Sequence, residues 1–168
     1  MDVYFSLGAN MGDREDHLET AVLMMADAFA CRPRRVSKTI ETKSWGFEGA
    51  DFLNNCVLFR LTRPRDLTPE EHALRILEQV KRIERILGRA EEGITRNEKG
   101  EREYHDRPID IDILFYGKEK IKTEALTIPH PLIAERDFVK IPLNEIATET
   151  LKRDFSTTLE MTKSGCSK

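Results

Sequence analysis

Two aspartates alternate with isoleucines in the stretch RPIDIDILFYG, residues 107–117. Successive side chains of a β-strand point to opposite faces, so Asp110 and Asp112 lie on one face and the isoleucines on the other. Neighbouring carboxylates repel each other unless a positive charge compensates, and oxygen ligands completed by substrate phosphates are typical of Mg²⁺. Two such ions suit an in-line displacement at phosphorus. The pair therefore indicates a magnesium site for phosphate chemistry. The structural alternative is simple solvent exposure, with pairing to Arg107 or a lysine.

Several arginines lie on both sides of this strand in the sequence. Guanidinium groups bind phosphates in a bidentate manner, and a long polar segment that carries several of them would close over a nucleotide. Each one taken alone is compatible with a solvated surface charge. Together they favour a bound nucleotide. They are Arg89, Arg96, Arg102, Arg107 and Arg136.

The stretch GFEGADFLNN combines aromatic and amide side chains. Phe52 and Asn54 begin an expected strand, and Trp45 and Phe47 lie in the loop before it. A flat heterocycle needs ring faces to stack on and an edge partner that both donates and accepts hydrogen bonds. Core packing is the alternative for Phe52. The phosphate-binding sequence GxxxxGK[ST] does not occur, and SLGANMGD is only a weak candidate for presenting backbone N–H groups at a helix N-terminus.

Hydrophobic periodicity and capping signals predict the elements that must position these residues. Apolar residues alternate in a first strand at 3–7, and a helical stripe from Leu18 to Phe29 follows an N-cap at Asp13. Thr68 begins a second helix through a capping box with Glu71. The remaining expected elements are a second strand that begins with Val36, Lys38 and Ile40, a third strand with Val57, Phe59 and Leu61 on its inner face, the end of the second helix at Gly88, a polar segment at 89–106, and the strand of the aspartates.

This order, β-α-β-β-α-β, predicts an α+β fold with a ferredoxin-like core, in which two helices cover one face of an antiparallel sheet. With the helices on the isoleucine face, the aspartate face is expected to be open to a ligand. From Lys118 onward we expect a small hairpin near Ile121 and Leu126, then one or two short helices around Ile133 and Leu143. One domain over residues 1–168 is predicted, and the last dozen residues are polar enough to fray.

Composition limits the class of protein. The chain has 168 residues, of which 39% are apolar, enough for one core, and its net charge of −3 provides no basic field for nucleic acid. No run approaches a membrane span, and the start of the chain has no signal-peptide core. The three cysteines, Cys31, Cys56 and Cys166, have no metal-ligand spacing. We therefore expect a reduced, cytoplasmic protein with neither nucleic-acid nor membrane partners.

Five motifs together resemble the 6-hydroxymethyl-7,8-dihydropterin pyrophosphokinase family of folate biosynthesis. They are SLGANMGD, DFLNN, RIERILGR, RPIDIDILFYG and IPHPLIAERDFVKIPLNEIA, collinear from about residue 4 to residue 147. The resemblance implies a ferredoxin-like core and transfer of the β,γ-pyrophosphoryl group of ATP to the pterin hydroxymethyl oxygen, with release of AMP. It also implies two Mg²⁺ ions, and a monomer is expected.

The resemblance also implies roles for residues at matching positions. The two magnesium ligands are Asp110 and Asp112, which form the catalytic set with Arg89 and Arg107. Contacts with ATP are implied for Glu84, Arg89, Arg107, Ile113, His130 and Arg136. Contacts with the pterin are implied for Thr42, Lys43, Trp45, Phe52, Asn54, Tyr104 and Phe138, with the rings of Phe52 and Phe138 on either side of the heterocycle.

The sequence departs from the family pattern at three pterin positions. Phe52 replaces a frequent tyrosine, Lys43 a common proline, and Tyr104 a frequent tryptophan. The segment after Arg89 is longer than in compact members, so either Arg96 or Arg102 is the ATP contact. A Mg²⁺-dependent nucleotidyl- or glycosyltransferase that uses the D-x-D pair is an alternative enzyme class. An RNA-binding sheet of the same topology is the alternative binding module, although it would need a basic surface.

Overall fold

The computed structural model describes residues 1–44, 47–89 and 106–155. Its main sheet has β1 (Asp2–Ala9) in the interior, between β4 (Phe52–Arg60) and β5 (Asp110–Tyr116), and both pairings are antiparallel. The outer side of β4 pairs with two short strands in succession, β2 (Arg35–Val36) and β3 (Ile40–Thr42). The strand order β2-β4-β1-β5 confirms the predicted ferredoxin-like sheet.

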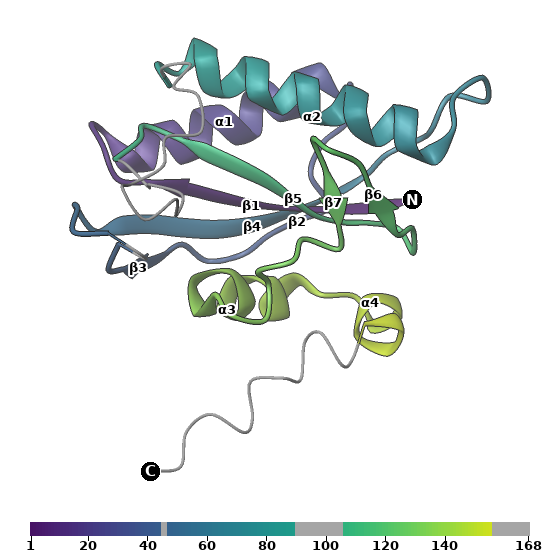
Figure 1. Cartoon of the computed structure of the whole chain (residues 1–168). Helices are drawn as coiled ribbons and strands as arrows, with labels where there is room; N and C mark the ends of the chain where they lie inside the picture. The colour runs from purple at the N-terminus through teal and green to yellow at the C-terminus, as the bar shows by residue number, and fades with distance from the viewer. Residues whose placement is uncertain (45–46, 90–105, 156–168) are drawn as a thin grey trace.

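Two helices, α1 (Arg14–Ala28) and α2 (Pro69–Ile86), cover one face of this sheet (Figure 1). Both predicted N-caps are confirmed: Asp13 accepts from the backbone N–H of Asp16, and Thr68 and Glu71 form a capping box. The apolar stripes of the helices pack on the sheet residues that alternate inward. This first core includes Val3, Phe5, Leu7, Leu18, Met25, Val57, Phe59, Ile76, Val80, Ile83, Ile111 and Ile113.

The opposite face of the sheet is only partly open, which corrects the sequence-based expectation. Helices α3 (Asp137–Ile146) and α4 (Glu149–Asp154) lie on that face, below the sheet in Figure 1. They form a second core with sheet residues such as Tyr4 and Leu58. The site is therefore confined to the part of this face that α3 and α4 leave uncovered.

The segment after β5 follows the prediction in part. The expected hairpin is present as β6 (Ile121–Lys122) paired with β7 (Thr127–Ile128). The helix expected around Leu143 is α3. The prediction allowed one or two helices here, and buried Ile133 lies in a series of turns that connects β7 to α3.

A bulge limits the alternation of β5 that the sequence predicts. Phe5 pairs with Ile113 and Tyr4 with Phe115, so Leu114 is an additional residue in β5. Leu114 and Phe115 both contribute to the second core as a result. Because the bulge lies after Asp112, the two aspartates keep the shared face that strict alternation predicts.

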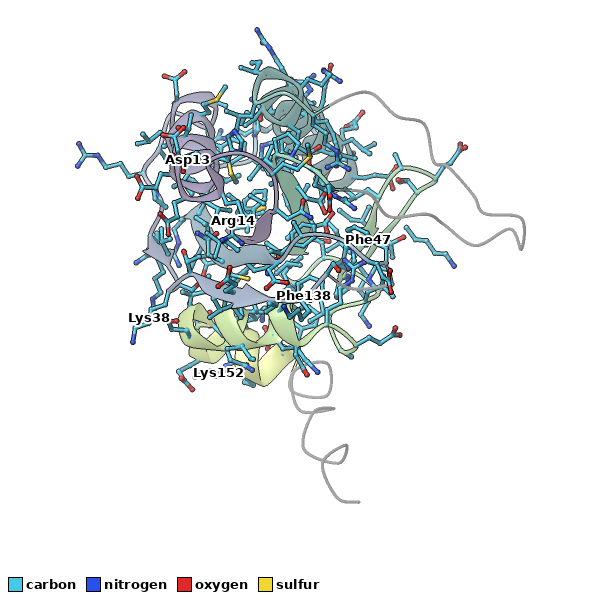
Figure 2. The ribbon with its side chains drawn as sticks, turned by 90° about the vertical axis from the view of Figure 1, so that its left-hand side faces the viewer. Asp13, Arg14, Lys38, Phe47, Phe138 and Lys152 are labelled. Atoms are coloured by element: carbon cyan, nitrogen blue, oxygen red, sulfur yellow. The ribbon has the colours of Figure 1, made fainter. Side chains whose placement is uncertain are left out.

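The end of the sheet where β1 ends and β4 and β5 begin carries the polar residues of interest, and Figure 2 looks onto this end, with Phe47 and Phe138 labelled there. Among the helices in the described ranges, none has the length and apolar character needed to span a membrane.

Candidate functional site

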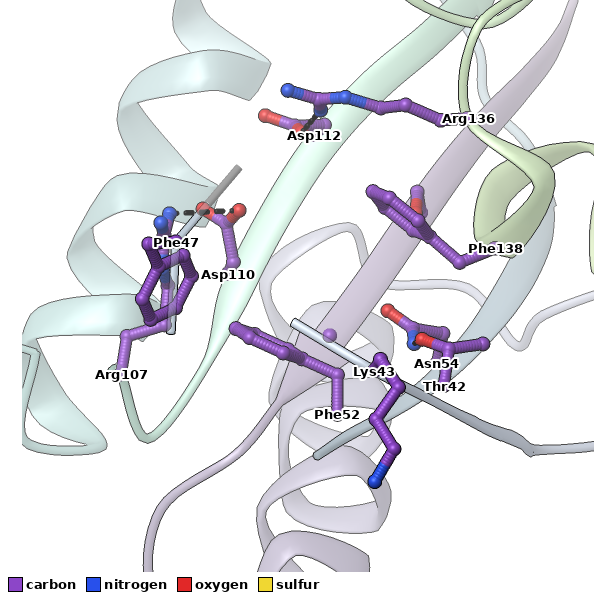
Figure 3. A pocket seen from close by; sticks show the side chains of 12 residues that line it. Thr42, Lys43, Phe47, Phe52, Asn54, Arg107, Asp110, Asp112, Arg136 and Phe138 are labelled. Atoms are coloured by element: carbon purple, nitrogen blue, oxygen red, sulfur yellow. Dashed lines mark hydrogen bonds and ion pairs between the residues drawn. The ribbon is translucent and has the colours of Figure 1, made fainter. Parts of the chain in front are cut away.

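A cleft opens at this end of the sheet, on the face that α3 covers only in part. Its empty space is about 520 Å³ with the open mouth included. It brings together residues from β1, β3, β4, β5, α3 and the connecting loops. The lining residues are Ser6, Gly8, Thr42, Lys43, Phe47, Phe52, Asn54, Arg107, Asp110, Asp112, Arg136 and Phe138 (Figure 3).

Gly8 forms the floor between the two halves of the cleft. In the sheet register it pairs with Asn54 on one side and with Asp110 on the other. A Cβ at Gly8 would come within 2.9 Å of Oδ1 of Asn54 and 3.5 Å of the Phe52 ring. Glycine therefore keeps open the space that joins the amide to the carboxylates.

Asp110 lies between two guanidinium groups. Its Oδ1 accepts a hydrogen bond from Nη1 of Arg89 at 2.5 Å, and its Oδ2 lies 3.0 Å from Nη1 of Arg107. Burial would raise the pKa of Asp110, but the positive charges of Arg107, Arg89 and Lys81 outweigh it and hold that pKa well below its usual range. Asp110 is therefore a carboxylate at any physiological pH.

Asp112 is held more loosely than Asp110. Nη1 of Arg136 lies 3.6 Å from its Oδ2, and Nε2 of His130 lies 3.9 Å from the same atom. Nδ1 of His130 accepts a hydrogen bond from the backbone N–H of Leu132, so the neutral ring carries its proton on Nε2, facing Asp112. The Asp112 side chain is 31% exposed, and its contacts are longer than hydrogen bonds, so its oxygens remain accessible to a cation.

Glu84 lies beneath the carboxylates and does not line the cleft. Its side chain is only 2% exposed. Oε1 accepts from Nη1 of Arg89 at 2.7 Å and from the backbone N–H of Ile111 at 2.6 Å, and Oε2 accepts from Nζ of Lys81 at 2.9 Å. Burial raises the pKa of Glu84, against the charges of Lys81 and Arg89. The contact with ATP stays a prediction, and these bonds connect Glu84 to the strand and to Arg89.

Aromatic and amide groups form the other half of the cleft. Phe52 and Phe138 both line it, and the guanidinium carbon of Arg136 lies 5.6 Å from the centroid of the Phe138 ring. Asn54 is buried, and its Nδ2 donates to Oγ1 of Thr42 at 2.9 Å. That is the only hydrogen bond of the Asn54 side chain within the described residues, so its carbonyl and second N–H are available to a ligand.

Lys43 lies at the rim of the cleft. Its Nζ is 2.9 Å from Oδ2 of Asp51, and the side chain is 88% exposed. That ion pair holds the lysine, which departs from the family pattern, at the edge of the aromatic pocket.

Several predicted residues are described but are not among those that line the cleft: Glu84, Arg89, His130 and Ile113. Trp45 and Tyr104 lie outside the described residues, as do Arg96 and Arg102 and with them the closing segment proposed from the sequence. Ile113 is described, but its side chain is buried in the core on the helix-covered face.

Sequence reasoning assigned no role to two lining residues, Ser6 and Gly8, and named Phe47 only as one of the aromatic residues in the loop before β4. Phe47 packs edge-on against Phe52 with ring centroids 6.3 Å apart, which adds a third aromatic group to the pocket. Its place in the aromatic stretch GFEGADFLNN was the signal that named it. Ser6 has no comparable signal, because only the register of β1 against β5 brings it beside Asp112.

These side chains are compatible with a Mg²⁺ ion that takes some of its oxygen ligands from the protein and the others from a substrate. Both carboxylates offer oxygen atoms on one face. No group of three or more metal-ligating side chains occurs in the described part of the chain. An ion held here would therefore need oxygen ligands from phosphates and water as well.

Comparisons with known proteins identify the family of the chain. The profile of the family described as 7,8-dihydro-6-hydroxymethylpterin-pyrophosphokinase matches residues 4–148. A 2-amino-4-hydroxy-6-hydroxymethyldihydropteridine pyrophosphokinase of Porphyromonas gingivalis is 41% identical over 147 residues, which are 86% of this chain and 90% of that protein. The enzyme of the same name from Bacillus subtilis is 37% identical over 150 residues, covering 89% and 80%. A mitochondrial folate synthesis bifunctional protein of Pisum sativum is 34% identical over 153 residues, covering 91% of this chain and 26% of the plant protein. As its motifs predict, the chain belongs to the 7,8-dihydro-6-hydroxymethylpterin-pyrophosphokinase family.

Proposed function

We propose that this chain transfers the β,γ-pyrophosphoryl group of ATP to the hydroxymethyl oxygen of 6-hydroxymethyl-7,8-dihydropterin, as a step of folate biosynthesis. The hydroxymethyl oxygen attacks the β-phosphorus, and a new oxygen–phosphorus bond forms. The bond from the β-phosphorus to the oxygen that bridges the α- and β-phosphates breaks, and AMP leaves. The hydroxymethyl proton passes to solvent. Membership of the family supports this reaction.

One observation carries the proposal: a phosphate half-site and a heterocycle half-site share a single cleft and meet at Gly8. The phosphate half contains Asp110, Asp112 and the cations around them. The other half offers aromatic ring faces and the available amide groups of Asn54. This arrangement suits a reaction that brings a flat acceptor next to a polyphosphate.

Asp110 and Asp112 would hold two Mg²⁺ ions together with the phosphates of ATP. Bound magnesium would neutralise charge on the phosphate oxygens during transfer. Both oxygens of Asp110 now lie against arginines. We expect Arg89 or Arg107 to leave the carboxylate and bind a phosphate when the nucleotide arrives.

The remaining side chains bind and orient the two substrates. Arg136 and His130 lie beside Asp112 and would stabilise negative charge on the transferred group. The rings of Phe52 and Phe138 would hold the pterin between them, with Asn54 bonded to its edge. Holding both reactants in one orientation lowers the entropic part of the barrier.

The reaction is tested by product analysis. The chain is incubated with Mg²⁺ and ATP, alone, with the hydroxymethyl pterin, or with the 6-methyl pterin that lacks the attacking oxygen. AMP and the pterin diphosphate are expected only with the hydroxymethyl compound. Formation of ADP, or AMP release that does not depend on the pterin, would contradict the proposal. Transfer to a sugar or nucleoside acceptor would favour the alternative D-x-D transferase.

A further inference from the structure

The side chain of Asn10, directly after β1, connects three separate parts of the chain. Asn10 is only 4% exposed. Its Nδ2 donates to the backbone carbonyl of Ala50 at 3.1 Å and to Oδ1 of Asp106 at 2.5 Å, and its Oδ1 accepts from the backbone N–H of Arg107 at 2.7 Å. A fourth bond runs from the backbone N–H of Asn10 to the carbonyl of Arg107 at 3.2 Å. Asn10 thus joins the loop before β4 to the chain that enters β5.

Each of the two connected segments leads into a different half of the cleft. Ala50 is two residues from Phe52, and the same loop carries Phe47. Arg107 lines the phosphate half and pairs with Asp110 at 3.0 Å. Asn10 therefore lies on a short covalent and hydrogen-bonded path between the two half-sites.

A second contact links the same segments. A Cβ at Gly49 would come within 2.3 Å of Cε2 of Phe47 and 2.5 Å of Oδ1 of Asp106. Phe47 and Asp106 therefore both pack closely against the backbone of Gly49. Residues 48–50 are exposed, and little buried surface holds this loop in place. Its order depends on hydrogen bonds such as the one from Asn10.

The chemistry at this position requires an amide. One acceptor and two donors of Asn10 are in use at once, which no carboxylate or single hydroxyl can supply. An aspartate would still accept from the Arg107 N–H. It would also place a carboxylate against Asp106 and against the carbonyl of Ala50, so the link to the loop would be lost.

We infer that Asn10 is a positioning residue that couples binding of the acceptor to binding of the nucleotide. The inference rests on the proposed function, because it assigns the two half-sites to pterin and ATP. Phosphates that bind Arg107 order the backbone at Asp106 and Arg107. Through the hydrogen bonds of Asn10 they also order the loop before β4, which carries Phe47. The second ligand then binds to a loop that is already ordered, which makes binding cooperative, and the coupling is reciprocal.

The test measures coupling instead of turnover. Calorimetry gives the dissociation constant of 6-hydroxymethyl-7,8-dihydropterin with and without Mg²⁺ and α,β-methylene-ATP, which cannot release AMP. The ratio of the two constants is the coupling factor. It is measured for the wild type and for Asn10→Asp, which keeps the acceptor for Arg107 and removes both donors. The third protein is Asp106→Ala, a change at an exposed residue that removes one of these bonds and should leave the fold intact.

Asn55→Ala is the matched control. Asn55 is 5% exposed, close to the value for Asn10, and its side chain makes no hydrogen bond within the described part of the chain. The Asn55→Ala substitution truncates a buried asparagine but changes no residue of either half-site.

We expect the nucleotide analogue to tighten pterin binding to the wild type and to Asn55→Ala by the same factor. Asn10→Asp should lower that factor at least about fivefold, the lower end of typical coupling between sites. Asp106→Ala should lower it by less. A wild-type coupling factor in both Asn10→Asp and Asp106→Ala would overturn the inference, as would a wild type that binds both ligands without coupling. If Asn10→Asp does not fold, Asp106→Ala alone decides. Failure of the wild type to bind either ligand would instead contradict the proposed function.

Discussion

The carboxylate of Glu84 accepts a hydrogen bond at 2.6 Å from the backbone N–H of Ile111, the residue between the two aspartates of the cleft. The same oxygen accepts from Arg89, which in turn donates to Asp110. A buried helix residue thus fixes both the strand that presents the aspartates and the arginine that balances their charge. Glu84 thus supports the site from α2, on the face of the sheet opposite the cleft.

Replacing Glu84 by Gln should reduce turnover, because it loosens Arg89 and the strand of the aspartates. Gln keeps an acceptor for Ile111 but loses the charge that holds Arg89 and Lys81. Hydrogen bonds to charged groups contribute ~1.5–3 kcal/mol, so kcat should fall about 10- to 100-fold. Steady-state kinetics should show a much smaller change in KM for ATP. Glu78→Gln, on an exposed part of the same helix, is the control. A change confined to KM would mean that Glu84 contacts the nucleotide directly.

Removing Glu84 altogether should destabilise the fold. Glu84→Ala leaves the positive charges of Lys81 and Arg89 without their buried partner. Arg89 keeps its bond to Asp110 and the Lys81 side chain is 39% exposed, so the expected loss is that of hydrogen bonds to a charged group, ~1.5–3 kcal/mol. Urea unfolding of Glu84→Ala and Glu84→Gln measures the difference. Equal stability for Glu84→Ala and the wild type would show that these charges find other partners.

Asp112 should be required for transfer. Its oxygens are the more accessible of the two carboxylates, and removal of a preorganised charged group typically lowers turnover about 10²- to 10³-fold. Asp112→Ala is compared with Asp66→Ala, an exposed aspartate in a loop away from the cleft. AMP formation is the measurement, and Mg²⁺ titration of ATP-analogue binding checks metal dependence. Near-normal activity of Asp112→Ala would contradict the proposed magnesium site.

Asn54 should select the pterin and not the nucleotide. Asn54→Ala leaves a ligand edge without its partner, at a cost of ~1–3 kcal/mol in pterin binding. Calorimetry should show a weakening of about 5- to 150-fold for the pterin and little change for the ATP analogue. A loss of the same size for both ligands would indicate that Asn54 supports the fold, through its bond to Thr42.

His72 should make stability fall on acidification. Burial and the charges of Arg63 and Arg75 lower the pKa of His72 below its ordinary value of 6.5. Its Nδ1 lies 2.8 Å from the hydroxyl of Tyr116, whose pKa burial raises to about 12, so the protonated phenol donates to the neutral imidazole. The unfolded chain binds the proton more readily, so the stability from this group is complete above pH 6.5 and is lost as pH falls through the lowered pKa. Thermal unfolding between pH 5 and 8 should show a smaller pH dependence for His72→Gln than for the wild type and for the control His17→Gln. Parallel curves for all three proteins would exclude this contribution.

Several features followed from the sequence because local rules govern them. Strand alternation gave Asp110 and Asp112 a common face, and the capping residues Asp13 and Thr68 marked the helix starts. These rules act over two to four residues, so neighbouring residues contain all the information they need. The sequence also indicated the family, because the family motifs are residue types at fixed spacing, which can be recognised without a structure.

Only the tertiary structure decided how the site is assembled, because the assembly depends on contacts between residues that are distant in the sequence. Only the strand register places Gly8 between Asn54 and Asp110, which are 56 positions apart, and so joins the two halves of the cleft. The resemblance implied a contact of Glu84 with ATP, and only the packing of α2 against β5 shows that its carboxylate is buried and bonded to the strand of the aspartates. Likewise, α3 covers part of a face that alternation alone leaves open. In each case the sequence specifies the side chain, and the packing of segments that are distant in the chain specifies what that side chain contacts.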